Sequence, residues 1–138
     1  MKAAGLNVPL MGGDGIYSGE YIKLAGATAD GDLATSVGAP TDTLPSATAF
    51  VEAYNAGGYS EPYEAYGAYA YDAANSIINA LKASLASADS AEAARQPTID
   101  AMAKVSFDEF GDTTSKVLTT YEVKDGKWAA VNTAAFES

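Results

Sequence analysis

The stretch Val8-Pro9-Leu10-Met11-Gly12-Gly13-Asp14-Gly15-Ile16-Tyr17-Ser18 decides the fold of this chain. Its first four residues form an apolar run, and the proline within it is typical of the first residue of a strand or of an edge strand. Three glycines within four positions then allow a tight backbone turn in which Asp14 presents the only side chain. Ser18 can cap a helix whose first turns follow at residues 21–25. The pattern predicts a strand, a glycine turn and a helix.

Asp14 has two interpretations. Ligands of α/β proteins bind beyond the carboxyl ends of strands, so a carboxylate in this turn is well placed to contact a small molecule. An aspartate in a glycine-rich turn also commonly accepts hydrogen bonds from neighbouring N–H groups. The turn lacks the G-x-G-x-x-G spacing of a dinucleotide site and the lysine of a P-loop. By itself, the turn favours the structural role.

The composition excludes several function classes. A chain of 138 residues can form one domain with a sizeable core. Its 8 basic and 18 acidic residues leave a net charge of −10, which argues against nucleic acid or an anionic membrane as a partner. The chain has no cysteine and no histidine, so thiolate or histidine metal sites and Ser-His-Asp or Cys-His catalysis are unavailable. We expect no enzyme activity, no cofactor and no metal.

Local signals predict the remaining elements. Residues 31–37 read as a second strand, parallel to the first because a helix connects the two. Ser46 is expected to cap a helix over residues 47–56, which Gly57-Gly58 ends. A long helix is predicted over residues 63–85, and a short one over residues 98–103. The apolar stripe of the long helix comprises Tyr66, Ala70, Ala73, Ile77, Leu81 and Leu85.

The C-terminal part of the sequence predicts a hairpin. Residues 116–123 alternate between apolar and polar side chains, and residues 127–131 follow after Asp125-Gly126, a strong two-residue turn signal. Trp128 is expected to pack across these strands. Residues 107–112 include three carboxylates, but their spacing does not match a calcium loop.

Four phrases together resemble a known family. They are VPLMGGDGIYS (8–18), GDLATSVGAP (31–40), EAYGAYAYDAANSIINAL (64–81) and VSFDEFGDTTSKVLTTYEVKDGKW (105–128). In the same order and spacing, they resemble the C-terminal part of the branched-chain amino-acid (leucine/isoleucine/valine) periplasmic binding proteins of ABC transporters. The resemblance covers most of the chain, from near its first residue to about residue 131.

The resemblance implies an α/β chain that forms part of a type I periplasmic-binding fold, in which two lobes close on an amino acid. Residues 1–38 would belong to the second lobe and residues 39–115 to the first. Residues 116–138 would return through the hinge to the second lobe as the terminal hairpin. The resemblance also implies a membrane permease as partner and a periplasmic or extracytoplasmic location for the full-length parent.

Two site residues carry over from the family by position. Asp14 matches the acidic residue that pairs with the ligand's ammonium group, where family members often have glutamate. Tyr66 matches the aromatic residue that lines the pocket, where some members have phenylalanine.

The segments that hold the ligand's carboxylate lie upstream in the family, and no signal peptide precedes Asn7, so we expect an incomplete fragment. Such a fragment would bind amino acids weakly or not at all, and its unpaired strand edges favour self-association. The alternative is a standalone α/β small-molecule sensor or interaction module without a transport role.

Overall fold

The computed structural model describes residues 2–104 and 116–136, so the predicted acidic turn at residues 107–112 lies outside the described part. The chain divides into two compact units, which are described separately below. One comprises Met1–Ala65 and Lys116–Ser138 and is called the sheet unit. The other comprises Tyr66–Ser115 and is called the helical unit. The predicted lobe boundaries, residues 1–38, 39–115 and 116–138, stay a prediction.

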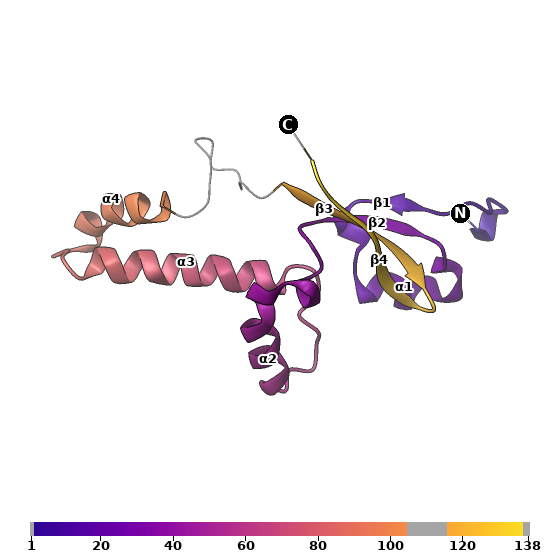
Figure 1. Ribbon diagram of the computed structural model, residues 1–138, viewed down its shortest axis with the longest axis horizontal. Coiled ribbons are helices and arrows are strands. Elements are labelled where there is room, and N and C mark those ends of the chain that lie inside the picture. Colours follow the sequence, from indigo (N-terminus) through magenta and orange to yellow (C-terminus); the bar gives the residue numbers. More distant parts are fainter. Residues whose placement is uncertain (1, 105–115, 137–138) are drawn as a thin grey trace. The chain divides into compact units, whose positions relative to one another are not determined.

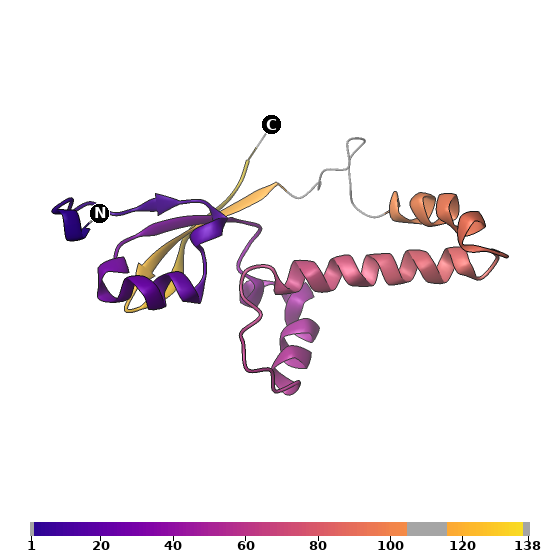
Figure 2. The ribbon, with the colours of Figure 1, turned by 180° about the vertical axis from the view of Figure 1, so that it is seen from behind.

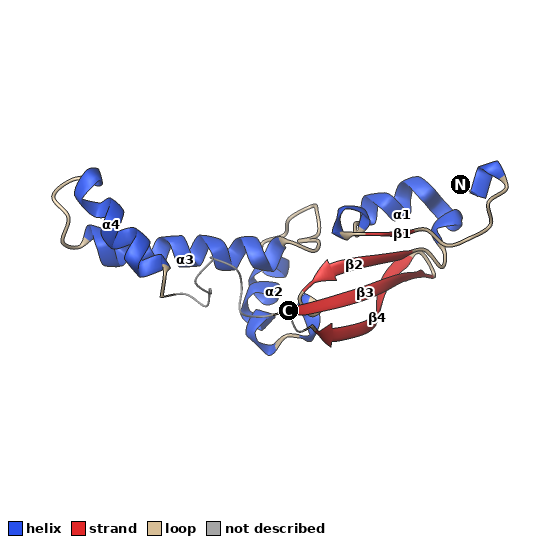
Figure 3. Cartoon of the chain, turned by 90° about the horizontal axis from the view of Figure 1, so that it is seen from above, coloured by secondary structure: helices blue, strands red, loops and turns tan. Residues whose placement is uncertain are grey.

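The sheet unit contains a mixed four-stranded sheet in the order β1-β2-β3-β4 (Figures 1 and 3). The strands are β1 (Met11–Gly12), β2 (Leu33–Val37), β3 (Val117–Lys124) and β4 (Lys127–Ala135). β1 and β2 are parallel, while β2–β3 and β3–β4 are antiparallel. The hairpin turn has Asp125 at φ 52° and Gly126 at φ 70°, the backbone that an Asp-Gly turn favours. The expected α/β fold with a terminal hairpin is confirmed.

The first strand is shorter than predicted. It comprises only Met11–Gly12, whereas the apolar run begins at Val8. Pro9 has no N–H to donate, and the N–H of Leu10 donates to the Asp32 carboxylate at 2.8 Å instead of to a strand partner. The ladder therefore begins with the Leu10 carbonyl, which accepts a 2.7 Å hydrogen bond from the N–H of Leu33.

One face of the sheet forms the core of this unit. The antiparallel register places Ala34 opposite Tyr121 and Ser36 opposite Thr119, and all four are buried. Val123, which is 1% exposed, pairs with Trp128 across the hairpin. The helix α1 (Gly19–Ala25) lies alongside this hairpin (Figure 2) and begins where Ser18 Oγ accepts a hydrogen bond from the N–H of Tyr21. The predicted serine cap and the alternation of β3 are both confirmed.

The second helix begins differently from the prediction. α2 spans Thr48–Ala56, and its N-cap is Ala47, which makes no side-chain cap hydrogen bond. The predicted Ser46 cap is wrong because Pro45 starts a 3-10 turn, Pro45–Ala47, that leads directly into the helix. The helix ends at Gly57 and Gly58 as expected, with Gly58 at φ 65°.

The long helix α3 spans Gly67–Leu85 and therefore begins four residues later than predicted. Glu64 has φ 50°, a left-handed conformation that a helix cannot include. The Tyr63 ring packs against the rings of Phe50 and Tyr54, with centroids 5.4 and 5.6 Å away. These contacts keep residues 63–65 in a loop.

The helical unit is a hairpin of α3 and α4 (Ala91–Met102), which lie side by side (Figure 1). Ser84 Oγ lies 2.7 Å from Thr98 Oγ1, and Ala80 and Ala94 are buried. The sequence reading placed a helix only at residues 98–103, but Ser90 caps a helix that runs through Pro97. Packing on α3 outweighs the hydrogen bond that this proline removes.

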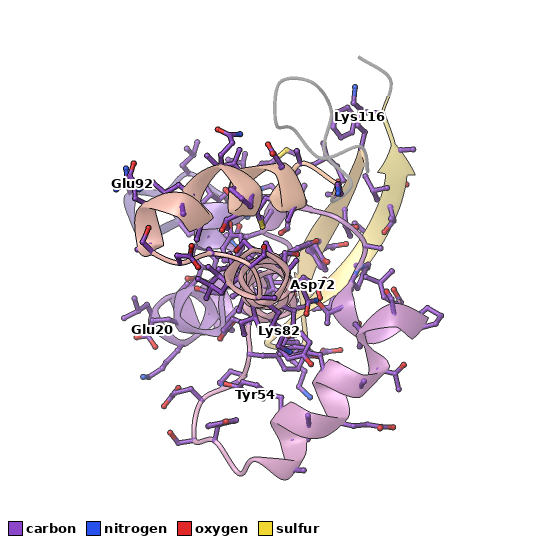
Figure 4. The ribbon with its side chains drawn as sticks, turned by 90° about the vertical axis from the view of Figure 1, so that its left-hand side faces the viewer. Glu20, Tyr54, Asp72, Lys82, Glu92 and Lys116 are labelled. Atoms are coloured by element: carbon purple, nitrogen blue, oxygen red, sulfur yellow. The ribbon has the colours of Figure 1, made fainter. Side chains whose placement is uncertain are left out.

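The predicted apolar stripe of α3 is exposed. Ile77 and Leu85 are 50% and 54% exposed, whereas the residues buried on this helix are Ala80 and Ser84. Viewed along α3, α4 covers only one side of the helix and side chains radiate from the other sides (Figure 4). Small residues allow the close approach of α4, so the stripe lies outside the contact within this unit.

Candidate functional site

Asp14 lies directly after β1, at the carboxyl end of that strand. It is the first residue of a 3-10 turn, Asp14–Ile16. The Asp14 carbonyl accepts a 3.0 Å hydrogen bond from the N–H of Tyr17. The side chain is exposed to solvent. Its position at the end of a strand and the start of a turn is the one that the sequence predicted.

Gly12 is the one glycine of this turn that close packing requires. A Cβ at this position would lie 2.6 Å from Ile16 Cδ1, so any side chain here would displace Ile16. A Cβ on Gly13 or Gly15 would meet nothing within 4 Å. The approach of the backbone to Ile16 therefore shapes the turn that presents Asp14.

An aromatic cluster holds the end of this turn in place. The ring of Tyr17 stacks on Tyr121 with centroids 4.0 Å apart and meets Trp128 edge-on at 5.6 Å. The indole N–H of Trp128 donates to the Ser18 carbonyl at 2.9 Å. Because Tyr17 and Ser18 follow the turn directly, the β3–β4 hairpin supports the segment that carries Asp14. The sequence predicts that Trp128 packs across the strands, whereas its hydrogen bond to Ser18 and its contact with Tyr17 come from the structure.

The electrostatic environment of Tyr17 is unfavourable to its ionisation. Burial raises the pKa of the Tyr17 hydroxyl well above its usual range, and a hydrogen bond with Tyr121 raises it further. The nearby carboxylates of Asp42 and Glu64 act in the same direction. Tyr17 is thus a neutral hydrogen-bonding group at physiological pH.

Tyr66 occupies the N-cap position of α3, with φ −104°, and is 48% exposed. Its carbonyl accepts a 2.9 Å hydrogen bond from the N–H of Ala70, which starts the helix. Asp14 belongs to the sheet unit and Tyr66 to the helical unit. A shared role of these two residues in one pocket stays a prediction.

Asp32 is a buried carboxylate that sequence reasoning did not single out. It is 5% exposed and accepts hydrogen bonds from the Leu10 N–H at 2.8 Å and the Tyr21 hydroxyl at 2.7 Å. Lys2 Nζ forms an ion pair with it at 3.5 Å and also donates to the Thr28 carbonyl. These contacts join the N-terminal segment, α1 and β2. No motif marks this residue, because its partners are up to 30 positions away in the chain.

The ionisation of Asp32 follows from these partners. Burial alone would raise the pKa of its carboxyl group, but the Leu10 N–H, the Tyr21 hydroxyl and Lys2 outweigh burial and lower the pKa below its ordinary value of 3.8. Burial and the hydrogen bond to Asp32 raise the pKa of Tyr21 to about 12. Among residues 2–104 and 116–136, the polar contacts of Asp32 all lie within the sheet unit, which is typical of a structural group.

Comparison with known proteins gives the relatives of this chain. No protein-family model matches it. In an alignment of 132 residues that covers 92% of this chain, it is 32% identical to the Leu/Ile/Val-binding protein homolog 2 of Brucella abortus (strain 2308) and to that of biovar 1 (strain 9-941). The chain is thus similar to the Leu/Ile/Val-binding proteins over most of its own length. It spans about a third (34%) of the length of these curated relatives.

Solved structures agree on the fold. The leucine binding protein LivK of Thermotoga maritima matches 97% of this chain with a TM-score of 0.76 and 23% identity, and the match covers 39% of that protein. A solute binding protein from R. palustris in complex with benzoate matches 96% of this chain at a TM-score of 0.71 and 23% identity, over 38% of its own length. A putative branched-chain amino acid ABC transporter from Rhodospirillum rubrum matches 94% of this chain with a TM-score of 0.64 and 24% identity, and the match covers 39% of that protein. The predicted type I periplasmic-binding fold and the predicted resemblance are confirmed.

Two further observations concern the described residues alone. In residues 2–104 and 116–136, acidic side chains do not gather in threes at a spacing that could hold a metal ion. None of the helices in those same ranges combines the length and the apolar character that crossing a membrane requires.

Proposed function

We propose that this chain is part of a solute-binding protein that captures a branched-chain amino acid for an ABC transporter. The observation that carries this proposal is the 32% identity to Leu/Ile/Val-binding proteins over nearly the whole chain. Because the chain spans 34% of those relatives, the proposal describes an incomplete fragment. The full-length parent would be periplasmic or extracytoplasmic, and its protein partner would be the membrane permease.

Asp14 is proposed to pair with the ligand's α-ammonium group. Its carboxylate is exposed at the carboxyl end of β1, and the Tyr17–Tyr121–Trp128 cluster supports the turn that carries it. A charge-assisted hydrogen bond to an ammonium is about twice as strong as a neutral one. Such a support keeps the carboxylate in position before the ligand arrives, which reduces the entropic cost of binding.

Tyr66 is proposed to form an aromatic wall of the same pocket. About half of its surface is exposed at the start of α3, so the ring is accessible to a ligand. One structural neighbour was solved in complex with benzoate, so an aromatic carboxylate is a second ligand class to test beside the aliphatic amino acids. The ring of a tyrosine can stack on the ring of such a ligand, and its hydroxyl can donate a hydrogen bond to the carboxylate.

The exposed stripe of α3 supports the fragment interpretation. Three residues of the stripe, Ile77, Leu81 and Leu85, are between 37% and 54% exposed, and Ile78 beside them is 46% exposed. Apolar patches of this kind commonly mark an interaction surface. In a full-length parent, a sheet of the first lobe would cover this stripe, and in the fragment the stripe and the strand edges favour self-association.

Calorimetric titration of a full-length parent tests the proposal. Leucine, isoleucine and valine are titrated beside benzoate, and we expect at least one branched-chain amino acid to bind. Asp14→Asn should weaken that binding at least about tenfold, because it removes the charge from the contact. Asp30→Asn is the matched control, since Asp30 is also exposed but lies outside the turn that carries Asp14. Unchanged affinity in Asp14→Asn would remove Asp14 from the site.

The alternative, a standalone α/β sensor or interaction module, makes a different prediction for the 138-residue chain. It requires a single cooperative unfolding transition and a defined dimer at low concentration. The fragment proposal expects instead separate transitions of the two units and open-ended association. Thermal unfolding and light scattering on the same sample distinguish the two.

A further inference from the structure

A cavity of about 350 Å³ lies at the C-terminal end of α2, between the helix and the loop that follows it. It is lined by Tyr54 and Asn55 from the last turn of the helix and by residues 59–63 of the loop. All of these residues belong to the sheet unit, and they include neither Asp14 nor Tyr66. The volume is at the small end of the range for ligand pockets, about 300–1,000 Å³, so the cavity suits a small molecule.

Three tyrosines of the cavity hold their rings at different angles. The ring of Tyr54 meets that of Tyr63 edge-on, with an angle of 85° and centroids 5.6 Å apart. The ring of Tyr59 is tilted by 40° from that of Tyr54 at a centroid distance of 4.7 Å. Tyr54 projects from α2 toward the loop, where its hydroxyl donates a 3.0 Å hydrogen bond to the Glu61 carbonyl (Figure 4). The three rings are therefore in mutual contact and are fastened to the loop backbone.

Gly57 allows the ring of Tyr59 to fold back over the end of α2. A Cβ on Gly57 would lie 2.6 Å from Tyr59 Cε2, so any side chain here would displace the ring. The backbone of Gly57 has φ −71° and ψ −14°, which alanine adopts without strain. The position of the Tyr59 ring, and not the backbone conformation, therefore requires a glycine here.

The charges around the cavity favour a cation. Among the residues that the structure describes, the cavity is lined by one acidic residue, Glu61, and by no basic residue. From residue 24 to residue 81 the sequence contains no lysine or arginine, whereas α2 and the loop carry Glu52, Glu61 and Glu64. The carbonyl groups at the C-terminal end of a helix add a partial negative charge.

We propose that this cavity binds a small organic cation, a free quaternary ammonium compound, against the rings of Tyr54, Tyr59 and Tyr63. A cation within about 6 Å of a ring centroid is attracted by the negative face of the ring. A methylated ammonium suits an aromatic wall because its methyl groups pack on the rings while its charge interacts with their faces. Glu61 and the end of α2 add attraction over a longer range. The site requires neither Asp14 nor the proposed transport role.

A nuclear magnetic resonance titration of the 138-residue chain with choline chloride tests the proposal. The ionic strength is held constant, and the backbone amide signals between residues 54 and 63 are followed. We expect saturable shifts in this segment with a Kd on the order of 1 mM, because each cation–π contact at a solvent-accessible site is weak. The neutral molecule of the same shape, 3,3-dimethylbutanol, should bind at least about tenfold more weakly because it lacks the charge. Glycerophosphocholine should also bind more weakly, because its phosphate adds a negative charge in acidic surroundings.

Variants identify the rings that hold the cation. Tyr59→Leu keeps an apolar side chain but removes the ring, and it should weaken choline binding about three- to fivefold. Tyr59→Phe keeps the ring and should bind like the wild type. Gly57→Ala should weaken binding by a similar factor to Tyr59→Leu, because its Cβ displaces the Tyr59 ring. Tyr71→Leu, at an exposed tyrosine of α3 outside the cavity, is the matched control and should bind like the wild type.

The same titration separates this site from the proposed function. Asp14→Asn and an excess of L-leucine should both leave the choline-induced shifts unchanged, even if Asp14→Asn abolishes amino-acid binding in a full-length parent.

Four results would overturn the inference. The first is the absence of saturable shifts with choline while the far-UV spectrum shows a folded chain. The second is equal affinity for choline and for either 3,3-dimethylbutanol or glycerophosphocholine, which would mean that the positive charge is not what the site recognises. The third is wild-type affinity in both Tyr59→Leu and Gly57→Ala, which would place the binding away from these rings. The fourth is competition by L-leucine, which would assign the binding to the amino-acid site instead.

Discussion

The sheet unit and the helical unit bury their residues in different ways. In the sheet unit, Thr119, Tyr121 and Val123 alternate inward along one strand, and a buried carboxylate, Asp32, joins three segments. In the helical unit, the buried residues of α3 are the small Ala80 and Ser84, while its large apolar side chains are exposed. The large side chains that stabilise the sheet unit are therefore buried within it, whereas the large apolar side chains of α3 in the helical unit are exposed. Substitutions in the two units should differ accordingly.

The largest effect is expected at Asp32. Asp32→Ala leaves the Leu10 N–H, the Tyr21 hydroxyl and the partly buried Lys2 without their shared partner. Breaking a buried, hydrogen-bonded charge costs about 3 kcal/mol of unfolding free energy. Denaturant unfolding followed by Trp128 fluorescence measures it. Asp30→Ala, next to it in sequence but exposed, should change stability by less than about 0.5 kcal/mol. Equal effects of the two would show that Asp32 does not hold these segments together.

Part of that stabilisation depends on pH. The folded-state pKa of Asp32 lies below its ordinary value of 3.8, so the unfolded chain binds the proton more readily. The contribution of Asp32 is fully present above about pH 4 and is lost as the pH falls through the folded-state pKa. Asp32→Asn should therefore show a flatter loss of stability between neutral and acidic pH than the wild type. Parallel curves for the two proteins would contradict the inferred ionisation.

The next effect is expected in the core of the sheet. Val123 is 1% exposed and pairs with Trp128, so Val123→Ala removes two methyl groups and leaves a cavity. The expected loss is about 2 kcal/mol of unfolding free energy. The same fluorescence-detected unfolding measures it, and Val131→Ala, on the outer strand and 43% exposed, is the matched control. A loss as large in the control as in Val123→Ala would mean that the core lies elsewhere.

A smaller effect is expected between the two long helices. Ser84 is buried, and its hydroxyl contacts Thr98 Oγ1 and donates to the Leu81 carbonyl. Ser84→Ala removes these bonds at a cost of about 1 kcal/mol, because the Thr98 hydroxyl keeps its bond to the Ala94 carbonyl. Amide hydrogen exchange along α3 and α4 should speed up, with the sheet unit unaffected. Faster exchange in the sheet as well would show that the two units unfold together.

The smallest effect on stability is expected on the exposed stripe. Ile77→Ser in α3 removes an apolar side chain that is 50% exposed, so the change should be within about 0.5 kcal/mol. The same substitution should reduce self-association, which sedimentation at increasing concentration measures. A loss of about 2 kcal/mol would show that the stripe is buried in solution and would erase the contrast between the two units.

Local sequence signals were sufficient where partners are near in the chain. The Ser18 cap, the Gly57-Gly58 helix end and the Asp125-Gly126 hairpin are each set by a few neighbouring residues, and the structure shows all three. The resemblance to the family could also be detected from the sequence, because four phrases in the family's order are specific even at 32% identity. The predicted Ser46 cap was wrong because Pro45 shifts the start of the helix, and the helix starting at residue 63 was wrong because Glu64 adopts a left-handed backbone.

What the sequence by itself determined is the order of the elements, the position of Asp14 after a strand, and the absence of cysteine and histidine. Only the tertiary structure decided which groups are buried and which meet. The partners of Asp32 are Lys2, Leu10 and Tyr21, and Trp128 reaches back 110 positions to Ser18. The exposure of the α3 stripe also required the structure. Periodicity shows which side chains share a face, but burial depends on what packs against that face.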